Sequence, residues 1–184
     1  MLRWLFVVLL AMAGPAWADA TVRICYGYGC LVQLDIRYAE ARLQELGHRL
    51  SQTRDAVAER QVLAEIIGRL YAWAGEQSDI HNDRGGNYAD AGIPGKMDCI
   101  DHSTSTTGLL EMLEARGYLR WHRVLAPEVR NFALIFPSHY SAVIEEKTDG
   151  EAARFVVDSW FVDNGQPAVI LPLDEWKKGA GPDV

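Results

Sequence analysis

Apolar side chains recur at helical spacing in the first half of the chain. In residues 37–50 the apolar positions fall three and four residues apart with charged residues between them, which predicts an amphipathic helix. A second apolar stripe runs up to Gly75 and predicts a second helix. Either Ser51 or Thr53 is expected to cap this helix, and Asp55 then lies in its first turn, where the helix dipole favours negative charge.

A third helix is expected over residues 99–116. Asp98 offers an N-cap for it and Gly117 offers a C-terminal stop. The preceding residues 78–96 contain four Gly, one Pro, two Asn and three Asp, which is the composition of a loop. Because a loop of this length in a compact domain usually carries function, we expect it to line a site.

The second half of the chain consists of β-branched and aromatic segments separated by turn residues. Two shorter segments of the same character precede the helices. This order predicts an α+β fold, with N-terminal helices packed on an antiparallel β-sheet. The expected strands are residues 21–24, 31–34, 132–136, 138–146, 154–162 and 168–171.

The composition is typical of one globular domain. The chain has 184 residues, of which 49% are apolar and 23% are charged. Its formal net charge is −7, so a basic surface that would neutralise a phosphate backbone is absent, and we expect no nucleic-acid partner. The chain has no internal repeat, which excludes solenoids and fibres.

The N-terminal segment has the pattern of a secretory signal. Residues 4–13 are uncharged and apolar. This stretch is too short for a membrane-spanning helix, which needs about 20 residues. The small-residue pattern at positions 16–18 then marks a cleavage site. We expect cleavage between Ala18 and Asp19, with cleavage after Ala20 as the alternative.

Cleavage at the first position divides the chain into two parts. Residues 1–18 form a signal peptide and residues 19–184 form a single domain. The mature chain is then expected to be periplasmic or secreted by bacterial export, without a transmembrane segment.

Export permits disulfide bonds, and the chain has three cysteines. Cys25 and Cys30 enclose Tyr-Gly-Tyr-Gly between two expected strands, and the two glycines can adopt the positive φ angles of a tight turn. We therefore expect a disulfide between Cys25 and Cys30, which leaves Cys99 as a free thiol.

Cys99 is expected to be an activated thiolate. At the start of a helix, backbone N–H groups and the helix dipole stabilise negative charge, so we expect its pKa to lie below the ~8.5 of a free thiol. His139 opens an expected strand and can accept the thiol proton. Asp158 in the next strand can orient the imidazole, with Asp163 as the alternative. Trp160 is expected either to wall a substrate groove or to belong to the core.

These features follow one another in a recognisable order. Residues 95–102, Gly-Lys-Met-Asp-Cys-Ile-Asp-His, open a helix, His139 starts a strand, and Asp158 lies in the following strand. In this order the chain resembles the bacterial transglutaminase-like cysteine peptidase group, part of the papain-like thiol superfamily, over residues 78–176. The resemblance implies a Cys99–His139–Asp158 triad on a transglutaminase- or papain-like α+β fold.

Two functions are compatible with these residues. The first is an exported cysteine hydrolase or acyltransferase that acts at an amide or isopeptide bond of a protein or peptide substrate in the cell envelope, through a Cys99 thioester. The second is a catalytically inactive binding module for an envelope protein or cell-wall partner. For the enzyme, the expected oxyanion donors are the backbone N–H of Cys99 and a side chain from Asn82, Asn87 or Tyr88.

The sequence also contains a partial calcium-loop pattern. Residues 79–83 alternate oxygen-bearing side chains, but the sixth position holds Arg84 instead of glycine and the twelfth holds Asp90 instead of a bidentate glutamate. Calcium-dependent members of the group carry acidic residues on both sides of the cysteine, whereas Ile100 follows Cys99 here. We expect no calcium site.

A zinc site at Cys99 is the other metal hypothesis. His102 follows Cys99 by three residues, and His81 and Asp101 are possible further ligands, but a second cysteine pair is absent. We therefore expect neither metal nor another cofactor. His102 is instead expected either on the polar helix surface or in assistance to Cys99. Asp101 is expected as a first-turn charge that the helix dipole favours.

The first prediction concerns the mature N-terminus. Intact mass measurement of the exported protein should give a chain beginning at Asp19, because the small residues at positions 16–18 fit the signal peptidase site. A chain beginning at Thr21 would identify the alternative site. Exported protein that retains Met1 would contradict the signal-peptide interpretation.

Overall fold

A computed structural model of the protein describes residues 18–131, 138–148 and 150–182. It is a mixed α+β structure, as expected. In chain order the elements are β1 (Ala20–Tyr26), β2 (Val32–Tyr38), α1 (Glu40–Ser51), α2 (Ala56–Gly75), the 3-10 helix η1 (Asp79–Asn82), α3 (Cys99–Ala115), β3 (His122–Arg130), β4 (His139–Glu146), β5 (Arg154–Asp158), β6 (Val169–Pro172) and α4 (Leu173–Lys177). Within these described ranges, no helix combines the length and the apolar character needed to cross a membrane.

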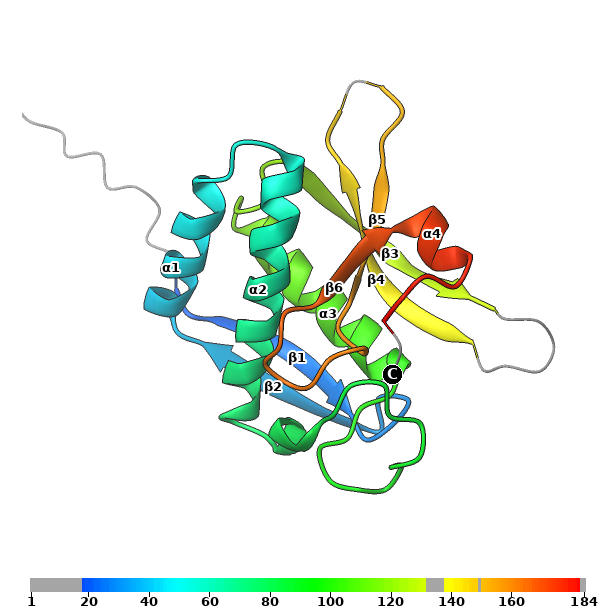
Figure 1. The fold of residues 1–184 in the computed structure, drawn as a ribbon. Helices are drawn as coiled ribbons and strands as arrows, with labels where there is room; N and C mark the ends of the chain where they lie inside the picture. Colours follow the sequence, from blue (N-terminus) through cyan, green and yellow to red (C-terminus); the bar gives the residue numbers. More distant parts are fainter. Residues whose placement is uncertain (1–17, 132–137, 149, 183–184) are drawn as a thin grey trace, which may run out of the picture.

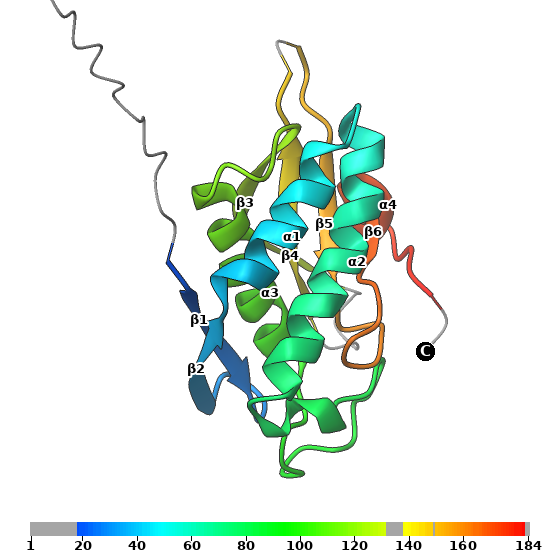
Figure 2. The same cartoon turned by 90° about the vertical axis from the view of Figure 1, so that its left-hand side faces the viewer.

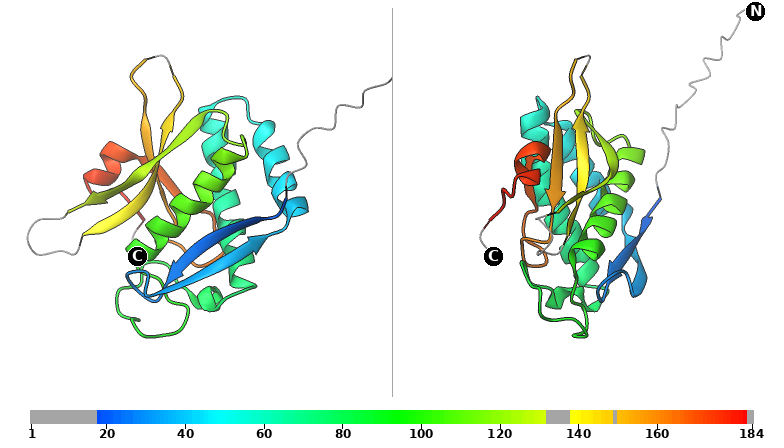
Figure 3. Two further views of the ribbon diagram at one scale, coloured as in Figure 1. Left: turned by 180° about the vertical axis from the view of Figure 1, so that it is seen from behind. Right: turned by 90° about the vertical axis from the view of Figure 1, so that its right-hand side faces the viewer.

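Helix α3 is the central element of the fold (Figures 1 and 3). The β1–β2 hairpin packs on one side of it and strand β4 packs on the other. Leu109, Leu110 and Leu113 on α3 are fully buried in the main hydrophobic core, together with apolar side chains from both of these elements. Helices α1 and α2 lie side by side and cover another part of this core (Figure 2).

The larger sheet has four antiparallel strands in the order β3-β4-β5-β6. Strand β3 has a register shift between Leu125 and Glu128, opposite β4. Pro127 falls inside this irregularity, where the proline's missing N–H costs no ladder hydrogen bond. The sheet is therefore a meander in which β4 and β5, which carry the candidate site residues, are the two central strands.

The three expected helices are present, and α3 begins at Cys99 with Asp98 as its cap, as expected. The N-termini of the other two differ from the sequence predictions. Helix α1 begins at Glu40 because Tyr38 belongs to β2. The prediction that Ser51 or Thr53 caps α2 was wrong. The cap is Asp55, whose side chain accepts a hydrogen bond from the backbone of Ala58. Ser51 is instead the last residue of α1.

The strand predictions were incomplete. Strand β3 was missed because its charged residues obscure the alternation expected of a strand; Arg123 pairs with Glu145 across the ladder. The expected strand at 132–136 lies outside the described residues. Strand β5 ends at Asp158 instead of continuing to 162, and the short helix α4 was not anticipated.

A buried carboxylate joins α2 to the start of β3. Glu59 has no solvent exposure, and its oxygens accept the backbone N–H groups of Arg120 (2.7 Å) and Trp121 (3.0 Å). They also lie 2.8 Å from Nδ1 of His122, the first residue of β3. Because all the partners of Glu59 donate, this carboxylate fixes the chain as it enters the sheet.

The second prediction tests this junction. Glu59→Gln should lower the free energy of unfolding by about 1–3 kcal/mol, because the amide offers one acceptor and turns an NH₂ group towards donors. Urea unfolding followed by circular dichroism measures the change. Glu45→Gln is the control, since Glu45 forms an exposed ion pair with Arg69 and its substitution should change stability by under about 0.5 kcal/mol. Equal stabilities for the two variants would contradict the assignment.

Candidate active site

The structure places Cys99 at the first position of α3. Asp98 is the N-cap, and its carboxylate accepts the N–H of Asp101 (2.8 Å) in a capping box. The Cys99 side chain is partly buried, and its Sγ lies 3.7 Å from the carbonyl oxygen of Ser138, which directly precedes β4. The backbone N–H of Tyr140 also acts on the sulfur and lowers its pKa. Cys99 thus contacts both chain neighbours of His139.

His139 is the first residue of β4 and is held by Asp158. Nε2 of His139 lies 2.7 Å from Oδ2 of Asp158, and both side chains are almost completely buried. Three aromatic rings surround the imidazole, at centroid distances of 4.8 Å for Trp160, 5.4 Å for Phe161 and 5.6 Å for Trp176. A ring hydrogen-bonded at Nε2 and enclosed in this way has one orientation and leaves Nδ1 for proton transfer.

Asp158 ends β5 and is fixed by further donors. Its Oδ2 accepts the indole N–H of Trp176 (3.0 Å), and its Oδ1 accepts the backbone N–H of Trp160 (3.2 Å). Asp158 therefore has hydrogen bonds at both oxygens despite its 1% exposure. These donors satisfy the buried carboxylate and fix its orientation towards the imidazole of His139.

Asp163, the alternative partner, lies away from this pair. Its carboxylate accepts the backbone N–H of Gly85 (3.0 Å) and pairs with Arg84 (2.9 Å), and these contacts hold its pKa below the usual range. It is not on β5 at all, because that strand ends at Asp158. The structure thus brings His139 together with Asp158 and not with Asp163.

The expectation of a depressed Cys99 pKa was wrong. Burial raises the pKa of the Cys99 thiol above its ordinary value, and the negative charges of Asp98 and Asp158 add to this effect. The N–H groups of Tyr140 and of Cys99 itself act in the opposite direction but do not compensate. In the resting protein Cys99 is therefore a neutral thiol, which needs a base in order to react.

The three oxyanion candidates have different surroundings. Tyr88 lies at the site: its ring packs on Trp160 at 4.7 Å, and its pKa is raised by burial and by the nearby Cys99. The Asn87 amide donates to Asp90 (2.5 Å). Asn82 is exposed at the end of η1. Of the three side chains, only Tyr88 has a described interaction with Cys99.

Trp160 belongs to a buried hydrophobic cluster, one of the two roles considered for it. It is 3% exposed, and its ring contacts the rings of His139 and of the largely exposed Tyr88. It follows β5 in a turn and does not share a strand face with Asp158. It thus separates the imidazole from solvent while supporting the aromatic side chain above it.

Comparisons of the chain with models of known families, with curated proteins and with solved structures found no match.

His102 is buried, which corrects the expectation of a surface position. Its Nε2 lies 2.9 Å from Oδ2 of Asp83, and its Nδ1 lies 2.8 Å from Oγ of Ser159. Asp83 also accepts the backbone N–H of Met97 (3.0 Å). This network links the loop before α3 to α3 itself and to the residue that follows Asp158. The network therefore supports both the helix that carries Cys99 and the chain that follows Asp158.

The possible calcium and zinc ligands do not lie together in the described part of the chain. Among the described residues, no three His, Cys, Asp or Glu side chains come together as a possible metal site. Asp83 is engaged with His102, and Asp90 forms a buried ion pair with Lys96 (3.1 Å). Asp101 accepts hydrogen bonds from the β1–β2 turn, while His81 is exposed.

Three residues that build the site were not expected from the sequence. Phe161 and Trp176 enclose His139, and Asp83 fixes His102. Nothing in the pattern around Trp176 indicates its contact with β5, because α4 is only five residues long. For Asp83 the signal was present as an aspartate in a glycine-rich loop, but the sequence pattern there indicated only a partial calcium loop.

The third prediction concerns this network. His102→Ala should lower the free energy of unfolding by about 1–3 kcal/mol, because Asp83 and Ser159 each lose a hydrogen-bond partner in a buried environment. Thermal or urea unfolding measures the loss. The exposed His81→Ala is the matched control and should stay within about 0.5 kcal/mol of the wild type. An unchanged His102→Ala protein would mean that the network does not stabilise the fold.

Proposed function

We propose that this protein is an exported cysteine hydrolase or acyltransferase that acts at an amide or isopeptide bond through a Cys99 thioester. One observation carries the proposal: the sulfur of Cys99 lies against the residues flanking His139, whose ring is held by the buried Asp158. Nucleophile, base and orienting carboxylate are the three parts that thiol acyl transfer needs.

The first chemical step begins from the neutral pair. As Sγ of Cys99 attacks the carbonyl carbon of the substrate, its proton passes to Nδ1 of His139. The imidazolium that forms is stabilised by Asp158 at Nε2, so positive charge develops where a buried negative charge already lies. The raised pKa of Cys99 makes this coupled transfer necessary, because little thiolate exists beforehand.

The proton then returns to the leaving amine, and the C–N bond breaks to leave a Cys99 thioester. Water attacks the thioester in a hydrolase and an amine attacks it in an acyltransferase, with His139 accepting the proton in either case. The backbone N–H groups of Cys99 and Tyr140 point at the sulfur side of the site. Tyr88, with its hydroxyl near Cys99, is the side-chain candidate for the oxyanion.

The substrate class follows from the setting of the site. The resemblance to transglutaminase-like cysteine peptidases, the signal-like N-terminus and the disulfide together favour a protein or peptide substrate in the bacterial cell envelope. The exposed Tyr88 ring on Trp160 offers an aromatic surface beside the nucleophile, which suits an apolar side chain of such a substrate.

A second function has one observation in its favour. Burial raises the pKa of Cys99, so the protein holds no preformed thiolate, and a binding module with the same fold would have no use for one. In this alternative the loop and Tyr88 hold an envelope protein or cell-wall partner without turnover. The two functions differ in whether Cys99 can be acylated.

The fourth prediction uses an activated ester. With p-nitrophenyl acetate, the folded protein should release p-nitrophenol and gain one acetyl group on Cys99, as read by intact mass and peptide mapping. His139→Ala should slow acetylation by about 100-fold or more, and Asp158→Asn by at least about tenfold, because both remove parts of the base. The residual His139→Ala reaction should keep rising above about pH 8.5, since it needs the thiolate of a thiol whose pKa is raised.

Matched controls separate catalysis from charge and folding. Asp163→Asn removes a carboxylate from the rejected position, and His48→Ala removes an exposed imidazole on α1; both should react as the wild type does. Cys99→Ala should abolish acetylation. If His139→Ala folds and reacts at the wild-type rate, the enzyme proposal fails and the binding module is preferred.

A further inference from the structure

The β1–β2 turn has an unusual backbone. Four of the five residues between the strands have positive φ angles: 85° at Gly27, 70° at Tyr28, 64° at Gly29 and 57° at Cys30. For the two non-glycine residues this left-handed conformation is unfavourable, so other contacts have to hold it. One of these contacts is the disulfide between Cys25 and Cys30, which closes the turn.

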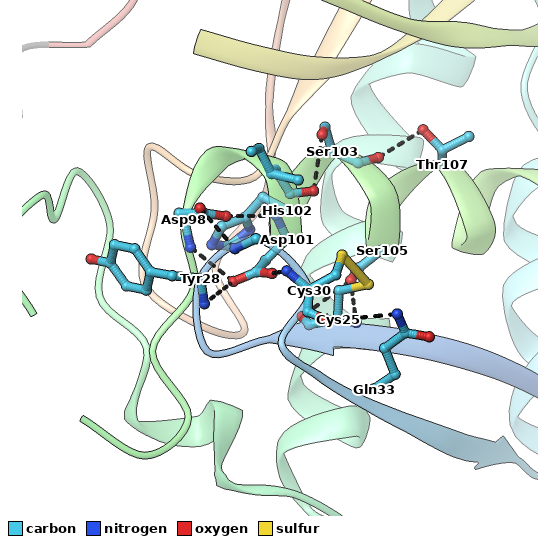
Figure 4. Close-up of a disulfide and its surroundings, with 12 residues drawn as sticks. Cys25, Tyr28, Cys30, Gln33, Asp98, Asp101, His102, Ser103, Ser105 and Thr107 are labelled. Carbon is cyan, nitrogen blue, oxygen red and sulfur yellow. Dashed lines mark hydrogen bonds between the residues drawn. A yellow bond between two sulfur atoms is a disulfide. The ribbon is translucent and has the colours of Figure 1, made fainter. Parts of the chain in front are cut away.

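The backbone N–H groups of the turn bond to residues at the N-terminal end of α3 and just before it (Figure 4), while the Tyr28 hydroxyl bonds to Asp90 in the loop. Each of the four turn residues directs its backbone N–H at the segment that carries Cys99. The four bonds are Gly27 to the carbonyl of Lys96 (2.8 Å), Tyr28 to Oδ2 of Asp101 (2.8 Å), Gly29 to Oδ2 of Asp98 (2.9 Å) and Cys30 to Oδ1 of Asp101 (2.6 Å). Successive N–H groups of this kind form a concave site for an anion, and here two carboxylates occupy it.

Asp101 links this turn to the helix cap. Its Oδ2 also accepts the backbone N–H of Asp98 (3.1 Å), while Asp98 accepts the N–H of Asp101 in return. Asp101 has no solvent exposure, and burial raises its pKa, so its ionised form depends on these donors. The same carboxylate therefore holds the turn and closes the first turn of α3, in which Cys99 is the first residue.

We propose that residues 27–30, their disulfide and the carboxylates of Asp98 and Asp101 form a redox-sensitive clasp that positions Cys99, with Asp101 as the positioning residue. The proposal rests on the proposed function in taking Cys99 as the nucleophile. Its direct consequence is that the reactivity of Cys99 depends on whether Cys25 and Cys30 are bonded.

Opening the clasp requires a two-electron reductant. A dithiol transfers two electrons and two protons to the Cys25–Cys30 bond, which becomes two thiols, while the dithiol closes to its own disulfide. The hairpin stays docked, because Cys25 N–H still donates to Oγ of Ser105 on α3 (2.9 Å). The turn, however, loses the covalent closure that holds its left-handed residues in place.

The effect on Cys99 follows from charge. The groups that titrate around its sulfur are Asp98 on α3, Asp158 and His139 on the sheet, and Tyr88 on the loop. In the clasp, N–H donors partly neutralise Asp98 and Asp101. Without these donors the two negative charges act more strongly on the helix start and disfavour the thiolate.

The experiment measures alkylation of Cys99 by iodoacetamide as a function of pH. In Cys25→Ala/Cys30→Ala, Cys99 is the only remaining thiol of the chain. We expect the pH midpoint to rise and the rate at pH 7 to fall about threefold relative to the wild type. Asp101→Asn removes one of the two negative charges at the helix start and should therefore lower the midpoint. Glu111→Gln, on the exposed face of α3, is the matched control and should leave the profile unchanged.

A second measurement avoids substitutions. Wild-type protein is reduced with dithiothreitol, and the reductant is then removed in the absence of oxygen. After alkylation and tryptic digestion, peptide 24–37 reports the label on Cys25 and Cys30, and peptide 97–116 reports the label on Cys99. Reduced protein should match the double variant. A folded double variant with the wild-type midpoint overturns the clasp, and if that variant does not fold, an unchanged midpoint in Asp101→Asn or in reduced wild type overturns it.

The two proposals fail separately. An unchanged alkylation midpoint together with His139-dependent acetylation overturns the clasp and leaves the enzyme. A shifted midpoint together with acetylation that is indifferent to His139 supports the clasp and overturns the enzyme.

Discussion

A carboxylate that is buried from water has to receive hydrogen bonds from the protein, and this requirement fixes the junctions of the fold. Glu59 receives the N–H groups that lead into β3, and Asp83 ties the loop before α3 to that helix. Asp101 accepts hydrogen bonds from N–H groups of the hairpin turn, and Asp158 is hydrogen-bonded to the imidazole of His139. Each carboxylate joins segments that are distant in the chain, so together they determine how helices, hairpin and sheet are placed.

The candidate site lies where these junctions meet. Cys99 begins α3, His139 begins β4 and Asp158 ends β5. The aromatic rings around His139 exclude water, which strengthens its hydrogen bond to Asp158. The same exclusion makes a charge on Cys99 costly. Burial therefore orders the pair and keeps the thiol neutral at rest, so that charge develops only when a proton moves.

The sequence alone determined the features that depend on neighbouring residues. The three long helices follow from apolar spacing, and Asp98 as the cap of α3 follows from its place before that spacing begins. The Cys25–Cys30 disulfide, which is confirmed, follows from a short glycine-containing turn. Strand β3 was not predicted because its charged side chains pair with residues on other elements, such as Glu145 on β4. The local sequence pattern does not indicate such pairs.

For the site, the sequence supplied the residue types and their order, and the tertiary structure decided their state. That Cys99 opens a helix and His139 a strand could be predicted locally, and the structure then placed Asp158, and not Asp163, on the imidazole. The direction of the Cys99 pKa and the burial of His102 could not be predicted. Both depend on how much water the packed elements exclude, and this exclusion exists only once residues distant in sequence have come together.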